Sequence, residues 1–523
     1  MILLNEKMQK GIVSFKHFIF RRPVLISIIV LIATFLCIYF YAFDHKIFLA
    51  GDNAEYYITG CALAEGKGYT NIQLPENPPA NHFSPGYPFI ISIAIRIFGE
   101  NMFAVQLVNG MFFIAAVILL YLITRVITNN NMLAFIVSLL ALLNAHLLFY
   151  SYITMSEIPF TFFYLLSIWL FIKSFSTGGA LRQSYLWLFA LSVVIAFYIK
   201  TPAIVILCAA MIILLVNKRW RQAILLSIIF LAAYVPWQLR TSRLGGNEYA
   251  KQVQLVNPYN AAEGKMKPAD YYNRFQENTV RYLSREIPSA VSGNTIKDYH
   301  SEIDWKNYSA GAFLVLLVIA GIFSLPRFKW FFLLSTGGFF FILVLWPSAW
   351  KGVRFMMPLI PVLTFLIVKG ALFMLEKALS VFFSWKKHMH YALFLFLPVI
   401  PYSAGQIKIL HANAQAPYVS NYDFYLKLAT WCKNNLPADA VIACRKPGLF
   451  YLFAHRKVTC YSFTKDGKQL IGDLKKGGVT HVVLDDLGFP STSLYLWPAM
   501  MNNQDEFESV KGMGNNFLAK VRR

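Results

Sequence analysis

Long apolar runs, separated by short polar or basic segments, dominate the sequence. The first run, 23–43, follows a basic stretch and has about the 20 residues that a helix needs to cross a bilayer. It lacks the small-residue cleavage site of a signal peptide, so we expect it to be retained as a span. Similar runs lie near 103–124, 132–150, 158–176, 184–199, 201–216, 222–239, 309–325, 330–346, 355–375 and 390–406. The pattern predicts a polytopic α-helical membrane protein with about eleven transmembrane helices.

The segment 85–98 is too short for a simple span, because it has only fourteen residues and contains Pro88 and Arg96. The positive-inside rule decides its place, since cytoplasmic loops are enriched in Lys and Arg. If the segment does not cross, the later basic clusters all lie in the cytoplasm: Arg125, Lys173 with Arg182, Lys218 to Arg221, Arg327 with Lys329, and Lys377 to Lys387. We therefore predict an interfacial or re-entrant helix in the first external loop.

This topology divides the chain into three parts. Residues 1–22 form a cytoplasmic N-terminus, and 23–406 form a transmembrane domain whose external loops are 44–102 and 240–308. Residues 407–523 lie outside, where the pattern changes to alternating strand-like and helix-like segments such as VIACR, PGLFYLF and THVVLDD. Such alternation predicts a small extracytoplasmic α/β domain.

Composition supports the membrane assignment. Of 523 residues, 57% are hydrophobic and 14% are charged, whereas soluble chains carry about a quarter charged residues. A net charge of +22 would suggest nucleic acid binding in a soluble protein. Here most Lys and Arg residues lie between apolar runs, so we expect no nucleic acid partner. The six cysteines show no metal-binding spacing, and Cys444 and Cys460 could pair outside the membrane, although spacing alone does not show it.

Acidic residues at the outer face are candidates for chemistry. Asp52, Glu55 and Tyr56 follow the first span in GDNAEYY, and Glu157 begins an apolar helix in SEIP. A carboxylate just outside the lipid could act as a general base on a substrate at the membrane surface. Helix N-termini also favour carboxylates, so capping is a sufficient structural explanation for both Asp52 and Glu157.

The first external loop also contains a turn-rich stretch, NHFSPGYPF, which leads into the short apolar helix. His82 could contact a phosphate, and Tyr87 could line a substrate site. An ordinary solvated loop histidine is the alternative for His82, and the sequence leaves both interpretations open.

Basic residues stand where charge is costly. Lys200 separates two apolar runs, Arg240 ends another, and Lys351 and Arg354 begin the run that extends to 375. A cation inside a bilayer costs about 2.5–3.5 kcal/mol on insertion scales, and such residues often mark sites or pathways. Snorkelling of the long side chains to lipid headgroups is the alternative. Cations together with carboxylates on one face suit an anionic, lipid-linked substrate, since a cation about 5 Å from a phosphate contributes roughly 3 kcal/mol at an effective dielectric of about 20.

The order of these stretches resembles glycosyltransferase family 39, the protein O-mannosyltransferase-like group with the GT-C fold. The matching stretches are GDNAEYY, FSPGYP, SEIP, PWQLR and VRFMMP, and they cover about residues 20–375. The bacterial branch of this family includes lipid A aminoarabinose transferases and lipopolysaccharide galacturonosyltransferases, and many members carry a periplasmic tail domain. Each stretch alone is a weak signal, whereas their order and shared sidedness are specific.

The resemblance implies an inverting glycosyltransferase that moves a sugar from a polyprenyl-phosphate donor to a lipid, glycan or protein acceptor, at the outer face of a bacterial inner membrane. It assigns Asp52 as the general base, Glu157 as a residue that places the acceptor or the base, and Arg354 as the contact of the lipid phosphate. Lys200 and Arg240 match positions where relatives often have basic residues. No nucleotide sugar is implied and no cofactor is certain, and a divalent metal stays open.

The sequence departs from the family pattern at two positions. Asn53 stands where many relatives have a second acid, and Phe83 or Ser84 stands where the aminoarabinose transferases have a lysine before a double proline. The second departure argues against an aminoarabinose donor and against a metal site near that loop. Neither departure removes the candidate base or the phosphate-binding arginine.

Two other classes of protein compete with a transferase. A transporter or flippase for a lipid-linked glycan would be expected to show related halves or broken helices at the bilayer midplane, and we find neither pattern. A membrane scaffold would need none of the candidate residues. The sequence does not identify the sugar, the prenyl chain or the acceptor.

Overall fold

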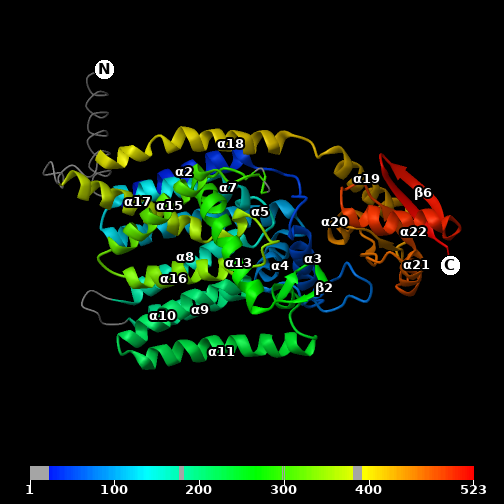
Figure 1. Cartoon of the computed structure of the whole chain (residues 1–523), viewed down its shortest axis with the longest axis horizontal. Coiled ribbons are helices and arrows are strands. Elements are labelled where there is room, and N and C mark those ends of the chain that lie inside the picture. The colour runs from blue at the N-terminus through cyan, green and yellow to red at the C-terminus, as the bar shows by residue number, and fades with distance from the viewer. Residues whose placement is uncertain (1–22, 176–181, 297, 300, 381–390, 523) are drawn as a thin grey trace, which may run out of the picture. The chain divides into compact units, whose positions relative to one another are not determined.

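The computed structural model of the chain describes its helices and strands over most of the sequence (Figure 1). The expected cytoplasmic N-terminus, 1–22, lies outside the described residues, as do Lys386 and Lys387. The described residues are 23–175, 182–296, 298–299, 301–380 and 391–522.

The chain forms two compact units. The first contains the chain up to His45 together with Gln106–Ala414, and the second contains Lys46–Val105 together with the chain from Gln415 onward. The first external loop therefore folds with the C-terminal segment. The sequence analysis instead assigned this loop to the transmembrane domain.

The first unit is helical (Figure 1), and most of its long helices coincide with apolar runs of the sequence. Within the described residues, α6 (Asn131–Leu142) and α7 (Ala145–Ser151) form a pair bent by 63° that counts as one further candidate span beside six long helices. The chain is a multi-pass helical membrane protein. The six long, apolar helices are α2 (Pro23–Ala42), α5 (Met102–Thr128), α8 (Glu157–Ser174), α11 (Trp220–Arg243), α15 (Trp305–Phe323) and α17 (Leu359–Leu379).

Several expected spans are shorter than a bilayer requires. The helices α9 (Gln183–Ile199), α10 (Ile204–Val216) and α16 (Lys329–Val344) are apolar but have 17, 13 and 16 residues. The run expected near 390–406 forms a 3-10 turn, Tyr391–Phe396, followed by α18 (Val399–Gln415). Length and composition therefore support six or seven of the eleven expected spans among the described residues.

Glycines let α15 and α17 pack backbone to backbone. A Cβ at Gly321 would collide with the carbonyl oxygen of Leu366, and a Cβ at Gly370 would collide with that of Leu317. Small residues allow such close approach between membrane helices, where lipid provides no hydrophobic drive for association. The backbone contact fixes the helix that begins just after Arg354.

The segment 244–304 between α11 and α15, which the sequence predicts to be a large external loop, has its own structure. The Arg274 guanidinium donates hydrogen bonds to the carbonyl oxygens of Val253 (2.9 Å) and Leu255 (2.8 Å), which ties the start of the loop to its central helix. A Cβ at Gly311 of α15 would collide with the Leu283 backbone, so the loop also packs directly on a spanning helix. Its elements are α12 (Glu248–Val253), β1 (Leu255–Asn257), β2 (Asn260–Lys265), α13 (Pro268–Arg281), a π-helical turn (Tyr282–Glu286) and α14 (Ile287–Ser292).

The C-terminal segment of the second unit is the α/β region that the sequence predicts. Its five-stranded sheet has the order β4-β3-β5-β7-β6, in which β3 pairs in parallel with β4 and β5, and β7 runs antiparallel to β5 and β6. The terminal hairpin was not expected from the sequence. The elements are α19 (Ser420–Asn435), β3 (Val441–Ala443), α20 (Pro447–Ala454), β4 (Lys457–Thr459), α21 (Gly467–Lys476), β5 (His481–Leu484), α22 (Trp497–Asn502), β6 (Phe507–Met513) and β7 (Asn516–Val521).

The first external loop contributes to the core of this α/β region. Ile47 is 7% exposed and belongs to the same apolar cluster as Tyr425 and Phe450. Backbone hydrogen bonds extend the contact, because the Val458 N–H of β4 donates to the Gln73 carbonyl oxygen at 2.8 Å. The loop and the C-terminal region thus fold as one body.

Two helices of the loop, α3 (Asn53–Ala64) and α4 (Gly86–Phe98), pack closely against each other in this unit. A Cβ at Gly60 would lie 2.4 Å from a side-chain atom of Ile91, so only glycine permits this approach. Arg96, the charge that made 85–98 a doubtful span, donates a hydrogen bond to the Leu63 carbonyl oxygen at 2.9 Å and so satisfies the C-terminus of α3.

We predict that Gly321→Ala lowers the stability of the first unit, because the added methyl group has no room against the Leu366 carbonyl. Overpacking of this kind costs about 1–3 kcal/mol. Gly337→Ala is the matched control, since nothing lies within 4 Å of a Cβ at that helical position. Thermal unfolding in detergent measures both variants, and an equal response of the two would contradict the close packing.

Candidate functional site

Three charged residues that lie far apart in the sequence meet in the first unit. The Glu157 carboxylate is 1% exposed, and its Oε1 accepts a hydrogen bond from the Lys200 Nζ at 2.8 Å. The Arg354 Nε lies 3.9 Å from the same oxygen. We call Glu157, Lys200 and Arg354 the charge cluster.

Each member of the charge cluster stands at a helix end or helix break. Glu157 is the first residue of α8, and Lys200 separates α9 from a short 3-10 turn, Thr201–Ala203. Arg354 lies in a second 3-10 turn, Val353–Met356, just before α17. Helix ends place charged side chains near the limits of apolar segments without burying them in the middle of a span.

The cluster carries a net positive charge, because two cations share one carboxylate. The Glu157 Oε2 atom is buried and has no hydrogen-bond partner among the described residues. Lys200 and Arg354 keep 21% and 25% of their side chains exposed, so both cations remain accessible. Two cations that share one buried carboxylate are suited to bind an anion such as a phosphate. Capping alone does not explain Glu157, because its carboxylate contacts residues of other helices.

A second, fully buried ion pair braces the loop that carries Arg354. The Arg281 Nε lies 3.0 Å from the Glu286 Oε1, and the two side chains are 7% and 0% exposed. Glu286 also accepts a hydrogen bond from the Gly352 N–H at 3.3 Å, while Arg281 donates to the Ser348 carbonyl oxygen at 2.8 Å. These residues flank the π-helical turn, a feature that is frequent at functional sites.

The same loop is held from the external helix α13 as well. The Asn278 side-chain amide donates to the carbonyl oxygens of Val344 (2.9 Å) and Trp346 (2.7 Å), where α16 ends. Two consecutive anchors, Asn278 and Arg281, thus fix the backbone between α16 and Arg354. A rigid backbone keeps a cation in place before a substrate arrives.

An aromatic group surrounds this loop. The rings of Tyr249 and Trp350 stack with centroids 4.6 Å apart, and Trp346 lies within 6.1 Å of Phe355. Lys351, a predicted substrate contact, holds its Nζ 5.9 Å from the Tyr299 ring.

Arg240 lies in the last turn of α11, where its guanidinium covers the Trp237 ring at 4.9 Å. Trp237 in turn lies 6.1 Å from the ring of Tyr198, two residues before Lys200. Arg240 is therefore connected to the Lys200 segment through aromatic contacts within the first unit.

The candidate base lies in the second unit. Asp52 occupies the N-cap position of α3, but its side chain makes no capping hydrogen bond. Glu55 follows in the first turn of α3, and burial together with the Asp52 charge raises the pKa of Glu55 to about 7, against the opposing charge of Lys446. A carboxyl group whose pKa is near neutral pH, beside a second carboxylate, is a common arrangement for proton transfer.

Other predicted residues of the loop form an aromatic group around α3. The Tyr56 ring lies 4.8 Å from Phe83 and 5.2 Å, edge-on, from Tyr87. His82 packs edge-on against Phe83 at 4.4 Å. Tyr87 is fully buried and Tyr56 is 6% exposed, so packing accounts for both positions, while His82 remains partly exposed.

Cysteines and metal ligands add nothing to the site in the described part of the chain. Cys444 and Cys460 are not joined by a disulfide, and Cys444 is buried while Cys460 is exposed. No group of three or more His, Cys, Asp or Glu side chains that could hold a metal occurs among the described residues.

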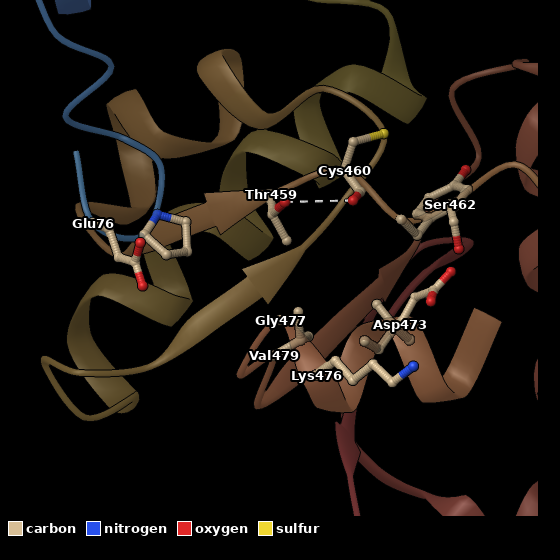
Figure 2. Close-up of a pocket in the computed structure, with 11 residues that line it drawn as sticks. Glu76, Thr459, Cys460, Ser462, Asp473, Lys476, Gly477 and Val479 are labelled. Atoms are coloured by element: carbon tan, nitrogen blue, oxygen red, sulfur yellow. Dashed lines mark hydrogen bonds between the residues drawn. The ribbon is translucent and has the colours of Figure 1, made fainter. Parts of the chain in front are cut away.

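A pocket of about 430 Å³ opens in the second unit, away from the predicted residues. Figure 2 shows its lining, which combines Glu76 of the first external loop with Thr459 at the end of β4, with Cys460 and Ser462 just after that strand, and with Asp473 and Lys476 of α21. Its lining includes Cys460, which the sequence analysis considered for a disulfide, but none of the candidate catalytic or substrate-binding residues.

Part of the membrane segment is similar to a known protein family. Residues 79–237 match the profile of the dolichyl-phosphate-mannose-protein mannosyltransferase family. The chain is a membrane glycosyltransferase, and over this segment it is similar to that family. The matched segment includes Glu157 and Lys200, whereas Asp52, Arg240 and Arg354 lie outside it.

Solved structures show that the glycosyltransferase has a GT-C-like fold. The chain is similar to ArnT from Cupriavidus metallidurans bound to undecaprenyl phosphate, with 12% identity, a TM-score of 0.61 and coverage of 94% of this chain and 97% of that one. It is also similar to the Archaeoglobus fulgidus oligosaccharyltransferase tethered with an acceptor peptide, with 13% identity, a TM-score of 0.60 and coverage of 89% and 69%. A search of curated protein sequences finds no match.

Sequence reasoning missed the residues that hold the site in place. Asn278, Arg281 and Glu286 lie in a polar helix of a long loop, where charged residues attract no notice. Lys446 carries a clearer signal, since a cation at the N-cap of α20 opposes the helix dipole and requires a compensating partner.

We predict that the charge cluster is energetically coupled. Lys200→Met should lower thermal stability by several degrees in the wild type but much less in Glu157→Gln, because breaking a buried pair leaves an uncompensated charge at a cost of about 3–5 kcal/mol. A double-mutant cycle on thermal unfolding in detergent measures this coupling.

Lys173→Met is the control for this cycle. Lys173 lies in the last turn of the helix that Glu157 begins, so the two residues are about 24 Å apart at 1.5 Å per residue. Its effect should be additive with Glu157→Gln. Additivity for Lys200→Met as well would contradict the coupling.

We also predict that Glu55→Gln raises thermal stability at pH 8 and changes it little at pH 4.5. In the folded protein the pKa of Glu55 is about 7, above its ordinary value of 4.5, so folding favours the protonated form. Wild-type stability from this group is therefore present at low pH and lost as the pH rises towards 7. The glutamine mimics the neutral form and avoids that loss.

Thermal unfolding of wild type and Glu55→Gln at several pH values between 4.5 and 8 measures the effect. Glu508→Gln, at an exposed position of β6, is the control and should show a pH-independent difference. A Glu55→Gln difference that does not grow with pH would rule out the raised pKa.

Proposed function

We propose that the protein is an inverting glycosyltransferase that moves a sugar from a polyprenyl-phosphate donor to a lipid, glycan or protein acceptor at the extracytoplasmic face of the membrane. The observation that carries the proposal is the charge cluster, a net positive group at helix ends, two of whose members, Glu157 and Lys200, lie in the segment similar to the mannosyltransferase family. The similar fold of ArnT, crystallised with undecaprenyl phosphate, supports a lipid phosphate as the donor.

The cations of the charge cluster would act on the leaving group. When the acceptor oxygen attacks the anomeric carbon, the bond from that carbon to the phosphate oxygen breaks, and its electron pair stays on the polyprenyl phosphate. Arg354 and Lys200 would stabilise this growing negative charge, since both are positioned by Glu157 before the reaction. The Arg281–Glu286 pair would keep the Arg354 loop from moving as the charge develops.

Asp52 would accept the proton of the acceptor hydroxyl as the new bond forms. Attack from the face opposite the phosphate inverts the anomeric configuration, and the proton of the acceptor hydroxyl ends on the Asp52 carboxyl group. Glu55 would contribute a neighbouring carboxyl group whose pKa of about 7 leaves it largely protonated at lower pH, which reduces repulsion beside Asp52. Glu157, in this scheme, positions the two cations.

The exposed side chains of α4 support its assignment as an interfacial helix. Phe89, Ile93 and Ile97 are spaced four residues apart on one face and are 58%, 44% and 66% exposed. A short helix with such an apolar face binds in the plane of a membrane interface. We propose that α4 lies there, with eleven crossings elsewhere, the N-terminus in the cytoplasm and the α/β region outside the inner membrane.

We predict that Asp52→Asn lowers the rate of sugar transfer by about 10²–10⁴-fold, the usual contribution of a general base. The assay follows transfer from polyprenyl-phosphate sugars to lipid, glycan and peptide acceptors by the purified protein in detergent. Asp439→Asn, at an exposed position of the same unit, is the matched control and should retain wild-type activity.

The outcomes separate the competing functions. Transfer that survives Asp52→Asn would retain the enzyme but remove Asp52 as its base. Absence of transfer from every donor, combined with translocation of a lipid-linked glycan in liposomes, would replace the proposal with a flippase.

A further inference from the structure

The segment that leads to the candidate base is held by the C-terminal region. Ile47 lies in the α/β core, and its carbonyl oxygen accepts a hydrogen bond from the Tyr418 hydroxyl at 3.2 Å. Two residues later, the Leu49 carbonyl oxygen accepts a hydrogen bond from the Lys446 Nζ at 2.5 Å. The backbone just before Asp52 is therefore fixed by side chains that come from nearly 400 residues further along the chain.

Lys446 is itself held in one place by aromatic rings. Its Nζ lies 5.7 Å from the centre of the Tyr422 ring and 5.8 Å from that of Phe489. Cation–π contacts of this length favour an ammonium group that has lost part of its water. The lysine stands at the N-cap of α20, where the helix dipole disfavours a cation, so its position must be stabilised by other charges.

Carboxylates of α3 provide those charges. Glu55 and Asp52 both favour the charged form of Lys446, while burial and the neighbouring Arg445 oppose it and lower its pKa. In the other direction, Lys446 favours the ionised form of Glu55. The groups that face one another here are Asp52, Glu55, Lys446 and Arg445.

The first turns of α3 and α20 approach each other closely at Gly448. A Cβ at Gly448 would lie 2.7 Å from the Glu55 Oε1 and 3.3 Å from the Ala54 Cβ. Pro447 and Gly448 thus bring the start of α20 directly onto the residues that follow Asp52.

We propose that Lys446 is a positioning residue for the Asp52 segment, and that the C-terminal α/β region is in this way a working part of the acceptor-side chemistry. The inference rests on the proposed function, in which Asp52 is the base. Lys446 fixes the backbone before Asp52 through Leu49, and its charge holds the Asp52–Glu55 pair in a form that can accept a proton. A tail that served only to recognise a partner would need neither contact.

The experiment measures kcat, the KM for the donor and the pH dependence of kcat/KM for full-length Lys446→Met, Lys446→Arg and Gly448→Ala. We expect kcat of Lys446→Met to fall by about 10²-fold, the effect of a misplacement of roughly 1 Å, with the donor KM within about twofold of wild type. Loss of the cation raises the pKa of nearby carboxyl groups, so the acid limb of the profile should move to higher pH. Lys446→Arg keeps the charge and should restore most of the rate.

Two controls match the chemistry of the variants. Lys468→Met changes an exposed lysine of α21, and Gly472→Ala adds a Cβ where nothing lies within 4 Å. Both should keep wild-type kcat and pH profile. If Lys446→Met does not fold, Gly448→Ala carries the same test, because its methyl group displaces the Glu55 carboxylate without removing a charge.

Asp52→Asn is assayed in parallel to separate the two proposals. Loss of transfer in Asp52→Asn, together with wild-type kcat and pH profile in Lys446→Met and Gly448→Ala, would overturn the role of Lys446 and leave the proposed function intact. Transfer that persists in Asp52→Asn would overturn the base assignment and this inference with it. A fall in kcat with an unshifted acid limb, equal in Lys446→Met and Lys446→Arg, would reduce Lys446 to a structural residue.

Discussion

A carboxylate that is 1% exposed must be compensated by charge, and for Glu157 the compensation comes from Lys200 and Arg354. Burying an unpaired carboxylate would cost several kcal/mol, so these partners are obligatory once Glu157 is buried. Each partner stands at an interruption of helical structure, at the end of α9 and before α17. These two interruptions bring both cations to the buried carboxylate and leave them partly exposed beside it.

In the second unit, two carboxylates, Asp52 and Glu55, lie near each other at the start of α3. Burial raises the pKa of Glu55 to about 7, and repulsion by the Asp52 charge is a smaller cause in the same direction. Lys446 offsets this repulsion from the C-terminal region, and Gly448 allows the approach. The unit thus stabilises two neighbouring acidic groups at the start of α3. The stabilising residues come from an α/β region for which the sequence predicts no other chemistry.

Most of the fold could be predicted because it depends on local patterns. Apolar runs of bilayer length predicted the long helices, and the change to alternating strand-like and helix-like segments predicted the α/β region of the tail. The segment 85–98 forms a helix of 13 residues, as its short apolar run suggests. The shorter runs were harder, since α9, α10 and α16 contain 17, 13 and 16 residues, so length alone does not decide whether they cross. The terminal hairpin of β6 and β7 was missed because its polar face lacks a clean alternation.

The charge cluster could be predicted from the sequence, whereas the residues that hold it in place could not. Glu157, Lys200 and Arg354 each stand at the edge of an apolar run, where charge is costly enough to be noticed, so their meeting could be anticipated from sidedness. Arg281 and Glu286 are equally buried, but they lie in a polar loop helix, where only the fold reveals that they are enclosed. Lys446 was hidden by distance along the chain, because its partner at Leu49 belongs to a segment that no local pattern connects to the tail.

The charges of the described residues suit the two requirements of the proposed reaction. Transfer from a lipid phosphate requires positive charge at the leaving group and a proton acceptor at the incoming hydroxyl, and the two requirements conflict if one set of side chains must meet both. The Glu157 carboxylate contacts Lys200 and Arg354 and is thereby engaged in positioning them. In the proposal the proton acceptor is Asp52, whose preceding backbone is fixed by Lys446 through Leu49. The assignment of the base to the first external loop rests on the family resemblance together with this engagement of Glu157.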